Sequence, residues 1–285
     1  MRRAGIDAAR LRLLLLLPGV APLATLFGLP LLWAFAGSLD GSESIAGPNL
    51  TAYRTILSDD AFARGLLASA YYAVVPTFLT MVLSIPLAAL LRRRFFGRKL
   101  FNGLFRLPLA VPSIVVAFMA LSCLDQGGFA SRVVGVVGLE MPRLIRDRWG
   151  LGVVLGTAWK EIPFATIIMI GAFGAVPEEL GHAARSLGAG RLRVFLSVDI
   201  PLAAPGITAA LLLCFIRSLG SFVIPGLLGP NYPLPLSVMM YQAFRDANWP
   251  RLDAIGMVLT GFSILVLLAY HAMSDHAGAR RRLSE

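Results

Sequence analysis

Residues 65–91 read GLLASAYYAVVPTFLTMVLSIPLAALL and contain no charged side chain. A helix needs about 20 apolar residues to cross the roughly 30 Å of hydrocarbon in a bilayer. The run does not alternate apolar and polar residues as the strands of a membrane barrel do, so a helix is expected. This stretch therefore predicts a membrane-spanning helix.

Further apolar segments of the same kind predict six spans in one integral membrane domain covering residues 1–285. The expected spans are about 13–36, 65–91, 104–124, 149–176, 202–228 and 254–274. Hydrophobic residues make up 57% of the chain and charged residues 15%, whereas soluble domains are roughly 25% charged. The expected fold class is an all-α membrane protein.

An alternative for the first segment is a cleaved signal peptide, because Ala34-Phe35-Ala36 imitates a cleavage site. Its apolar run is longer than the roughly 7–15 residues of a signal core. We therefore expect the segment to remain as a span.

The distribution of basic residues predicts the orientation, because arginine and lysine concentrate in cytoplasmic connections. The basic residues assigned to that side are Arg2, Arg3, Arg10, Arg12, Arg92, Arg93, Arg94, Arg98, Lys99, Arg106, Arg185, Arg191, Arg193, Arg280, Arg281 and Arg282. Both termini and the connection 177–201 are thus predicted to be cytoplasmic, in a multi-pass membrane protein. This topology accounts for the net charge of +10, and no nucleic-acid partner is expected.

The connection 177–201 is unusually long and polar for a turn between spans; from residue 178 it reads EELGHAARSLGAGRLRVFLSVDIP. Pro177 precedes two glutamates, which suit the positive end of a helix dipole. Leu180, Ala183, Ala184 and Leu187 fall on one helical face. Gly188 and Gly190 then predict a break, and a second short helix is expected to run to Pro201. A helix–glycine–helix unit outside the bilayer predicts a docking element for a soluble partner.

The pattern Ala183-Ala184, Gly188 and Val198-x-Ile200-Pro201 resembles the cytoplasmic "EAA" loop of ABC-importer permeases. In that family the loop forms a coupling helix that sits in a cleft of the ATPase subunit. His182 stands where the family has a leading glutamate, and Glu178 and Glu179 lie one turn upstream. The resemblance implies these ATPase-coupling residues: Glu178, Glu179, His182, Ala183, Ala184, Leu187 and Gly188. It also implies ATPase partners, a second permease and an extracytoplasmic substrate-binding protein, around a chain embedded in the lipid of a bacterial inner membrane.

Charged residues inside the predicted spans point to the transport pathway, because such charges usually face a bundle interior or a cavity. Lys160-Glu161 lies within the fourth span, and Arg217 lies in the outer half of the fifth. Arg217 has two interpretations, a cation lining the pathway or an arginine paired for structural reasons. The pathway candidates are Lys160, Glu161, Arg217, Ser221 and Phe222.

Three segments resemble the permeases of polyamine-type importers, a group whose related systems handle ferric iron, thiosulfate or aminoethylphosphonate. They are Leu219–Gly229, Trp159–Phe164 and Leu107–Pro112. The resemblance implies that the second permease is a different chain. Polyamine permeases often carry an acidic residue where this chain has Ser221, so an anionic or zwitterionic substrate is also consistent with the sequence.

Motifs for other chemistry are absent from the sequence. It contains no GxxxxGK[ST] phosphate-binding loop, so a partner must hydrolyse ATP. No catalytic residues, metal ligands or cofactors are predicted, and the chain is not expected to be an enzyme. Two alternatives remain open, an ion-coupled secondary transporter that works without an ATPase and a membrane enzyme or scaffold.

Overall fold

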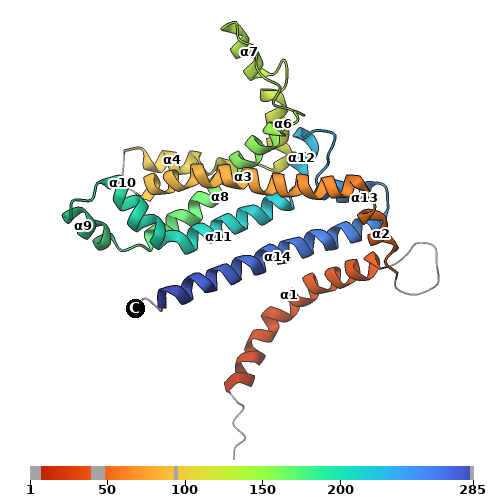
Figure 1. Cartoon of the computed structure of the whole chain (residues 1–285), viewed down its shortest axis with the longest axis horizontal. Coiled ribbons are helices and arrows are strands. Elements are labelled where there is room, and N and C mark those ends of the chain that lie inside the picture. Colours follow the sequence, from red (N-terminus) through yellow and green to blue (C-terminus); the bar gives the residue numbers. More distant parts are fainter. Residues whose placement is uncertain (1–7, 40–48, 93–95, 283–285) are drawn as a thin grey trace, which may run out of the picture. The chain divides into compact units, whose positions relative to one another are not determined.

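The computed structural model describes residues 8–39, 49–92 and 96–282. Arg2, Arg3, Arg93 and Arg94, which enter the orientation prediction, lie outside these ranges. The regular structure of the described residues is entirely helical (Figure 1). Its elements are α1 (Ala8–Ser38), α2 (Thr51–Leu57), α3 (Asp60–Arg92), α4 (Arg98–Leu104), α5 (Leu107–Ala110), α6 (Ser113–Leu124), α7 (Phe129–Val136), α8 (Leu151–Gly174), α9 (Glu178–Ser186), α10 (Arg191–Val194), the π-helix η1 (Phe195–Asp199), α11 (Ile200–Leu219), α12 (Val223–Leu228), α13 (Leu236–Arg245) and α14 (Trp249–Arg282).

Six helical segments among the described residues are long and apolar enough to cross a membrane. They are Leu15–Ser38, Asp60–Arg92, Ser113–Val136, Leu151–Gly174, Arg191–Leu219 and Trp249–Tyr270. The predicted all-α fold class with six spans is therefore confirmed.

The chain divides into two compact units, of which the first comprises Met1–Asp59 and Met240–Gly261. Inside this unit the Tyr53 hydroxyl donates a 2.8 Å hydrogen bond to Ser38 Oγ, which in turn donates to the carbonyl of Phe35 at 2.6 Å. Arg251 forms a 3.2 Å ion pair with Asp59. These contacts connect the end of α1 to α2, and the start of α14 to the short link between α2 and α3.

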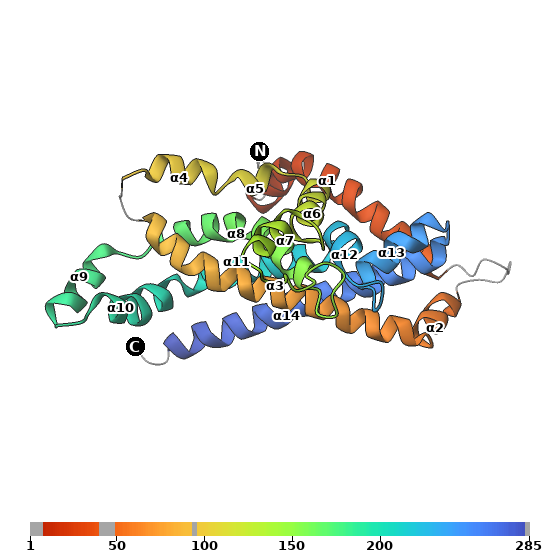
Figure 2. The ribbon, with the colours of Figure 1, turned by 90° about the horizontal axis from the view of Figure 1, so that it is seen from above.

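The second unit comprises Asp60–Met239 and Phe262–Glu285, and its centre is formed by α3, α8 and α11, which lie side by side (Figures 1 and 2). Small residues let these helices approach closely, as is usual where lipid offers no hydrophobic driving force between helices. A Cβ on Gly206 of α11, for example, would collide with Ala172 of α8. The buried core of this group consists of Met81, Ala88, Ala165, Met169, Phe173, Val176, Ala203, Ala210 and Cys214.

The fifth predicted span, 202–228, is arranged differently from the continuous helix that was expected. Helix α11 ends at Leu219, residues 220–222 are not helical, and α12 begins at Val223. Gly220 favours this break, because glycine loses more conformational freedom in a helix than other residues do. The break turns the chain next to Arg217.

The second helix of the polar connection does not end at Pro201, contrary to the sequence prediction. Helix α10 passes through η1 directly into α11, with Pro201 in the first turn of α11. A first helical turn tolerates proline because its N–H groups need no intrahelical partner. The second half of the connection is thus helically continuous with the fifth span.

Candidate functional site

The polar connection begins with α9, and the sequence carries charged residues suited to the first and last turns of this helix. Glu178 and Glu179 lie in the first turn and Arg185 in the last, which complements the helix dipole. After α9, the Gly188 N–H donates to the Arg185 carbonyl at 2.9 Å and the Ala189 N–H donates to the Ala184 carbonyl at 3.1 Å. This pair of bonds is a Schellman motif, which requires a left-handed residue at its turn. Gly188 supplies it with a φ of +85°.

One face of α9 is apolar and lies open in this chain. Leu187 is 90% exposed and Leu180 is 45% exposed, and Ala183 between them is also exposed. None of the α9 residues is buried. An exposed leucine pair flanking alanine is a surface that a partner could cover.

The connection is tied to the end of α3 by Arg92. Arg92 Nη1 lies 3.4 Å from Asp199 Oδ1 in η1, and Arg92 Nη2 lies 4.0 Å from Glu178 Oε1 at the start of α9. The Arg92 and Asp199 side chains are each only 22% exposed. The guanidinium therefore links α3, α9 and η1, and these elements lie together at one end of the second unit (Figures 1 and 2).

A cavity of about 470 Å³ is bordered by the three residues of this linkage. His182 lines it together with Arg92, Arg185, Arg191, Glu178 and Asp199. His182 thus faces a charged space, and Glu178, one turn earlier, borders the same space.

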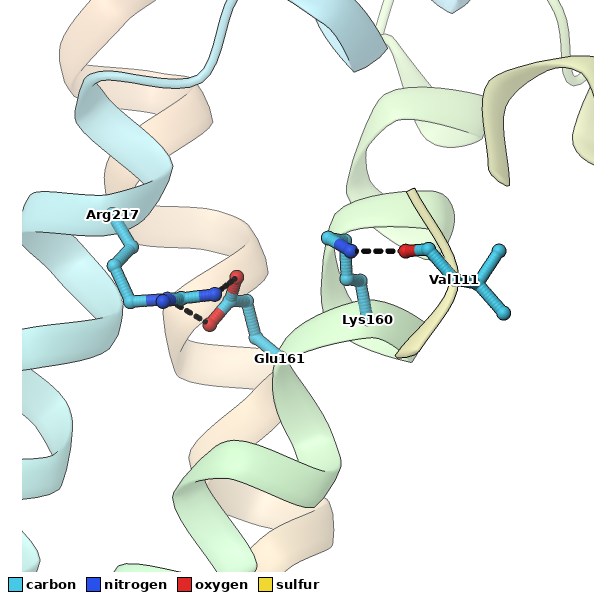
Figure 3. A network of polar contacts seen from close by, with 4 residues as sticks. All are labelled: Val111, Lys160, Glu161 and Arg217. Atoms are coloured by element: carbon cyan, nitrogen blue, oxygen red, sulfur yellow. Dashed lines mark hydrogen bonds and ion pairs between the residues drawn. The ribbon is translucent and has the colours of Figure 1, made fainter. Parts of the chain in front are cut away.

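Two of the charged residues predicted inside the spans, Glu161 and Arg217, pair across α8 and α11 (Figure 3). Arg217 Nε and Nη2 donate to the two carboxylate oxygens of Glu161 at 2.9 and 3.1 Å. The guanidinium also lies over the ring of Phe164, 4.6 Å from its centroid. The Glu161 side chain is 8% exposed, whereas that of Arg217 is 45% exposed. Arg217 is therefore paired, as the second of its two interpretations predicted. One side of its guanidinium nevertheless remains exposed.

Lys160 points away from its neighbour Glu161, since adjacent helical residues lie about 100° apart. Its ammonium donates a 2.6 Å hydrogen bond to the Val111 carbonyl between α5 and α6 (Figure 3). A cavity of about 260 Å³ separates Lys160 from Arg217. Its lining residues are Ser113, Thr157, Lys160, Glu161, Arg217, Ser218, Ser221 and Ile224.

Four of the five pathway candidates thus gather around one cavity, and Phe222 lies partly exposed in the neighbouring break. The hydroxyl residues Ser113, Thr157 and Ser218 were not predicted from the sequence. A hydroxyl next to an intramembrane charge, as in Arg217-Ser218, is the signal that could have indicated them. Arg92 was predicted only as one of many cytoplasmic charges, because its partner Asp199 is distant in sequence.

Residues 81–283 match the family described as the binding-protein-dependent transport system inner membrane component, and the chain belongs to this family. It is 31% identical over 206 residues to the probable molybdenum ABC transporter permease protein of Haloferax volcanii, covering 72% of each chain. It is 28% identical over 245 residues to the sulfate transport system permease protein CysT of Escherichia coli K12, covering 84% of this chain and 81% of the relative.

Solved structures share the fold at low sequence identity. A bacterial ABC transporter involved in the import of the acidic polysaccharide alginate has a TM-score of 0.80 at 18% identity, over 93% of this chain and 95% of the other. A methionine ABC transporter in an inward-facing conformation has a TM-score of 0.59 at 19% identity, over 75% and 94%. The chain is accordingly a membrane-spanning permease subunit of an ABC importer.

The resemblance to polyamine-type permeases is not supported by these relatives, whose names refer to molybdenum and sulfate. The wider prediction of an importer permease is confirmed. The family assignment also replaces the alternatives of a secondary transporter and a membrane enzyme.

Proposed function

We propose that this chain forms one half of the translocation pathway of an importer for a small inorganic oxyanion. A substrate-binding protein would deliver the ion on the outer side, and ATPase subunits would drive transport from the cytoplasm. The cargo class comes from relatives that are named for molybdenum and sulfate transport, and the net positive cavity between Lys160 and Arg217 suits it. The second half of the pathway would be a different permease chain.

The ATPase contact is assigned to the polar connection 177–201. The observation that carries it is the open apolar face of α9 together with Leu187, the residue at its C-cap, which is 90% exposed. Such a residue outside the spans is costly in water unless a partner buries it. The chain itself has no phosphate-binding loop, so a soluble ATPase is the partner that an ABC permease needs here. In this arrangement Arg92 would transmit movement of α9 to α3.

The orientation follows from the same assignment. Arg92, at the end of α3, contacts Glu178 and Asp199 of the connection, and the basic helix α4 begins a few residues later with Arg98 and Lys99. This end of the second unit would face the cytoplasm, as would both termini.

Gly188 offers a test of the docking role. A Cβ there meets no atom within 4 Å, so a substitution acts through the φ of +85°, which costs an L-residue about 1–2 kcal/mol. Gly188→Val should change the path of the chain after α9 and abolish substrate-stimulated ATP hydrolysis while the complex remains in the membrane. Gly188→Asn is the matched control, since asparagine tolerates the left-handed conformation, and it should retain most of the stimulation. Normal stimulation in the valine variant would contradict the docking role.

A further inference from the structure

We propose that the cavity between Lys160 and Arg217 is a binding site for one tetrahedral oxyanion of the sulfate or molybdate kind. The ion would occupy it during passage through the membrane domain. This inference rests on the proposed function and assigns the transported ion a binding site within the membrane domain. Figure 3 shows the two cations that delimit the site, on α8 and α11, with Glu161 between them.

The charges of the site favour the binding of an anion, and they limit how tightly it is bound. Lys160 and Arg217 contribute two positive charges, and Glu161 neutralises one of them through its bidentate pair with Arg217. One net positive charge in a membrane interior attracts an anion strongly and repels a polyamine. The partial neutralisation also matters, because a transport site must bind weakly enough to release its ion.

Both cations retain unused hydrogen-bond donors. An arginine carries five N–H groups, and Glu161 accepts from Nε and from one hydrogen of Nη2. Both hydrogens of Nη1 and the second of Nη2 are therefore available on the open side of the guanidinium. A lysine ammonium carries three donors, and the Val111 carbonyl accepts one.

Hydroxyl groups complete the lining. Ser113, Thr157, Ser218 and Ser221 all border the cavity, and Ile224 is its apolar member. Ser218 is 4% exposed, and its hydroxyl has no hydrogen-bond partner within the described part of the chain. A buried hydroxyl without a partner costs about 1–3 kcal/mol, so a ligand oxygen at this position would remove an existing penalty.

The helix α6 adds backbone donors on the Lys160 side. It begins at Ser113, which lines the cavity. The first helical hydrogen bond is donated by the Val116 N–H to the Pro112 carbonyl, at 3.1 Å. The N–H groups of the preceding turn have no intrahelical acceptor, and the helix dipole places positive potential there.

The size of the cavity limits the ligand. A volume of about 260 Å³ is several times the roughly 30 Å³ that one water occupies in the liquid. It accommodates an ion of five heavy atoms with a few waters, and it is too small for a polysaccharide. The many hydroxyl and cationic donors match four oxygen acceptors arranged around one centre.

The test measures binding directly, without the substrate-binding protein. The chain is purified in nanodiscs with its second permease and its ATPases, and equilibrium dialysis is performed with radiolabelled molybdate and sulfate. We expect saturable binding of one ion per copy of this chain. Lys160→Gln removes a charge-assisted donor and should weaken binding about tenfold. Ser218→Ala removes a neutral donor and should weaken it about threefold.

Lys99→Gln is the matched control, because Lys99 is exposed on α4 and its loss should leave binding unchanged. The proposal is overturned if neither ion binds saturably, or if Lys160→Gln and Ser218→Ala bind as the control does. If Lys160→Gln does not yield a folded complex by gel filtration, Ser218→Ala decides alone, since it removes a single oxygen atom.

Uptake into proteoliposomes with the binding protein separates the two proposals. Oxyanion uptake that continues while the dialysis shows no binding at this cavity refutes the site and leaves the proposed function standing. Uptake of another cargo, with oxyanions excluded, refutes the proposed cargo and with it the site.

Discussion

The ion pair between Glu161 and Arg217 predicts an unequal response to loss of either partner. Both hydrogen bonds are short, at 2.9 and 3.1 Å, but Glu161 is 8% exposed and Arg217 is 45% exposed. Arg217→Ala leaves a buried carboxylate without a counterion, which costs about 3–5 kcal/mol. Glu161→Gln leaves a guanidinium with an open side and a stacking contact to Phe164, so the loss should resemble that of a surface pair, about 1 kcal/mol.

The two variants are compared by the thermal stability of the purified complex, measured as the fraction that survives heating in size-exclusion chromatography. With about 2 °C in Tm for each kcal/mol in a chain of this size, Arg217→Ala should lower Tm by about 6–10 °C and Glu161→Gln by about 2 °C. The double variant Glu161→Gln, Arg217→Ala should recover much of the loss, because neither charge of the pair then remains.

The outcome also tells which environment the open side of Arg217 meets. An unpaired arginine facing lipid costs about 2.5–3.5 kcal/mol near the bilayer centre, which would make Glu161→Gln nearly as damaging as Arg217→Ala. Equal losses in the two single variants, or no recovery in the double variant, would refute the reasoning that Arg217 lies toward a water-filled pathway.

Three further predictions concern coupling, orientation and packing. Arg92→Ala removes the link to Asp199 and should reduce substrate-stimulated ATP hydrolysis severalfold with basal hydrolysis unchanged, whereas Arg92→Lys should restore part of it; equal stimulation in all three forms would contradict a coupling role. A cysteine at Leu187, in a background without native cysteines, should react with a membrane-impermeant maleimide only from the cytoplasmic side and only before ATPase subunits are added; labelling from the outside would reverse the proposed orientation. Gly206→Val places a branched side chain against Ala172 and should cost about 1–3 kcal/mol through overpacking, seen as a lower Tm; an unchanged Tm would show that α8 and α11 separate easily.

Local features of the sequence account for the spans and for the loop's first helix. Span prediction succeeds because bilayer insertion depends on the apolar length of each segment taken alone. The end of α9 is equally local: Gly188 adopts the left-handed conformation because the carbonyls that close the motif lie within the preceding turn. Both the spans and the end of α9 could be predicted from the sequence without knowing which helices are neighbours.

The pairings of the site depend on tertiary structure. Glu161 and Arg217 are 56 residues apart in sequence and Arg92 and Asp199 are 107 apart, so the sequence left open whether Arg217 was paired. The cavity between Lys160 and Arg217 is lined in part by Ser221 from the turn at 220–222 and by Ile224 from α12, where the sequence predicted a single span over 202–228. Helix formation and insertion are governed by neighbours along the chain. Charge pairing and cavities are governed by which helices pack together. Small residues such as Gly206 determine that packing through contacts distant in sequence.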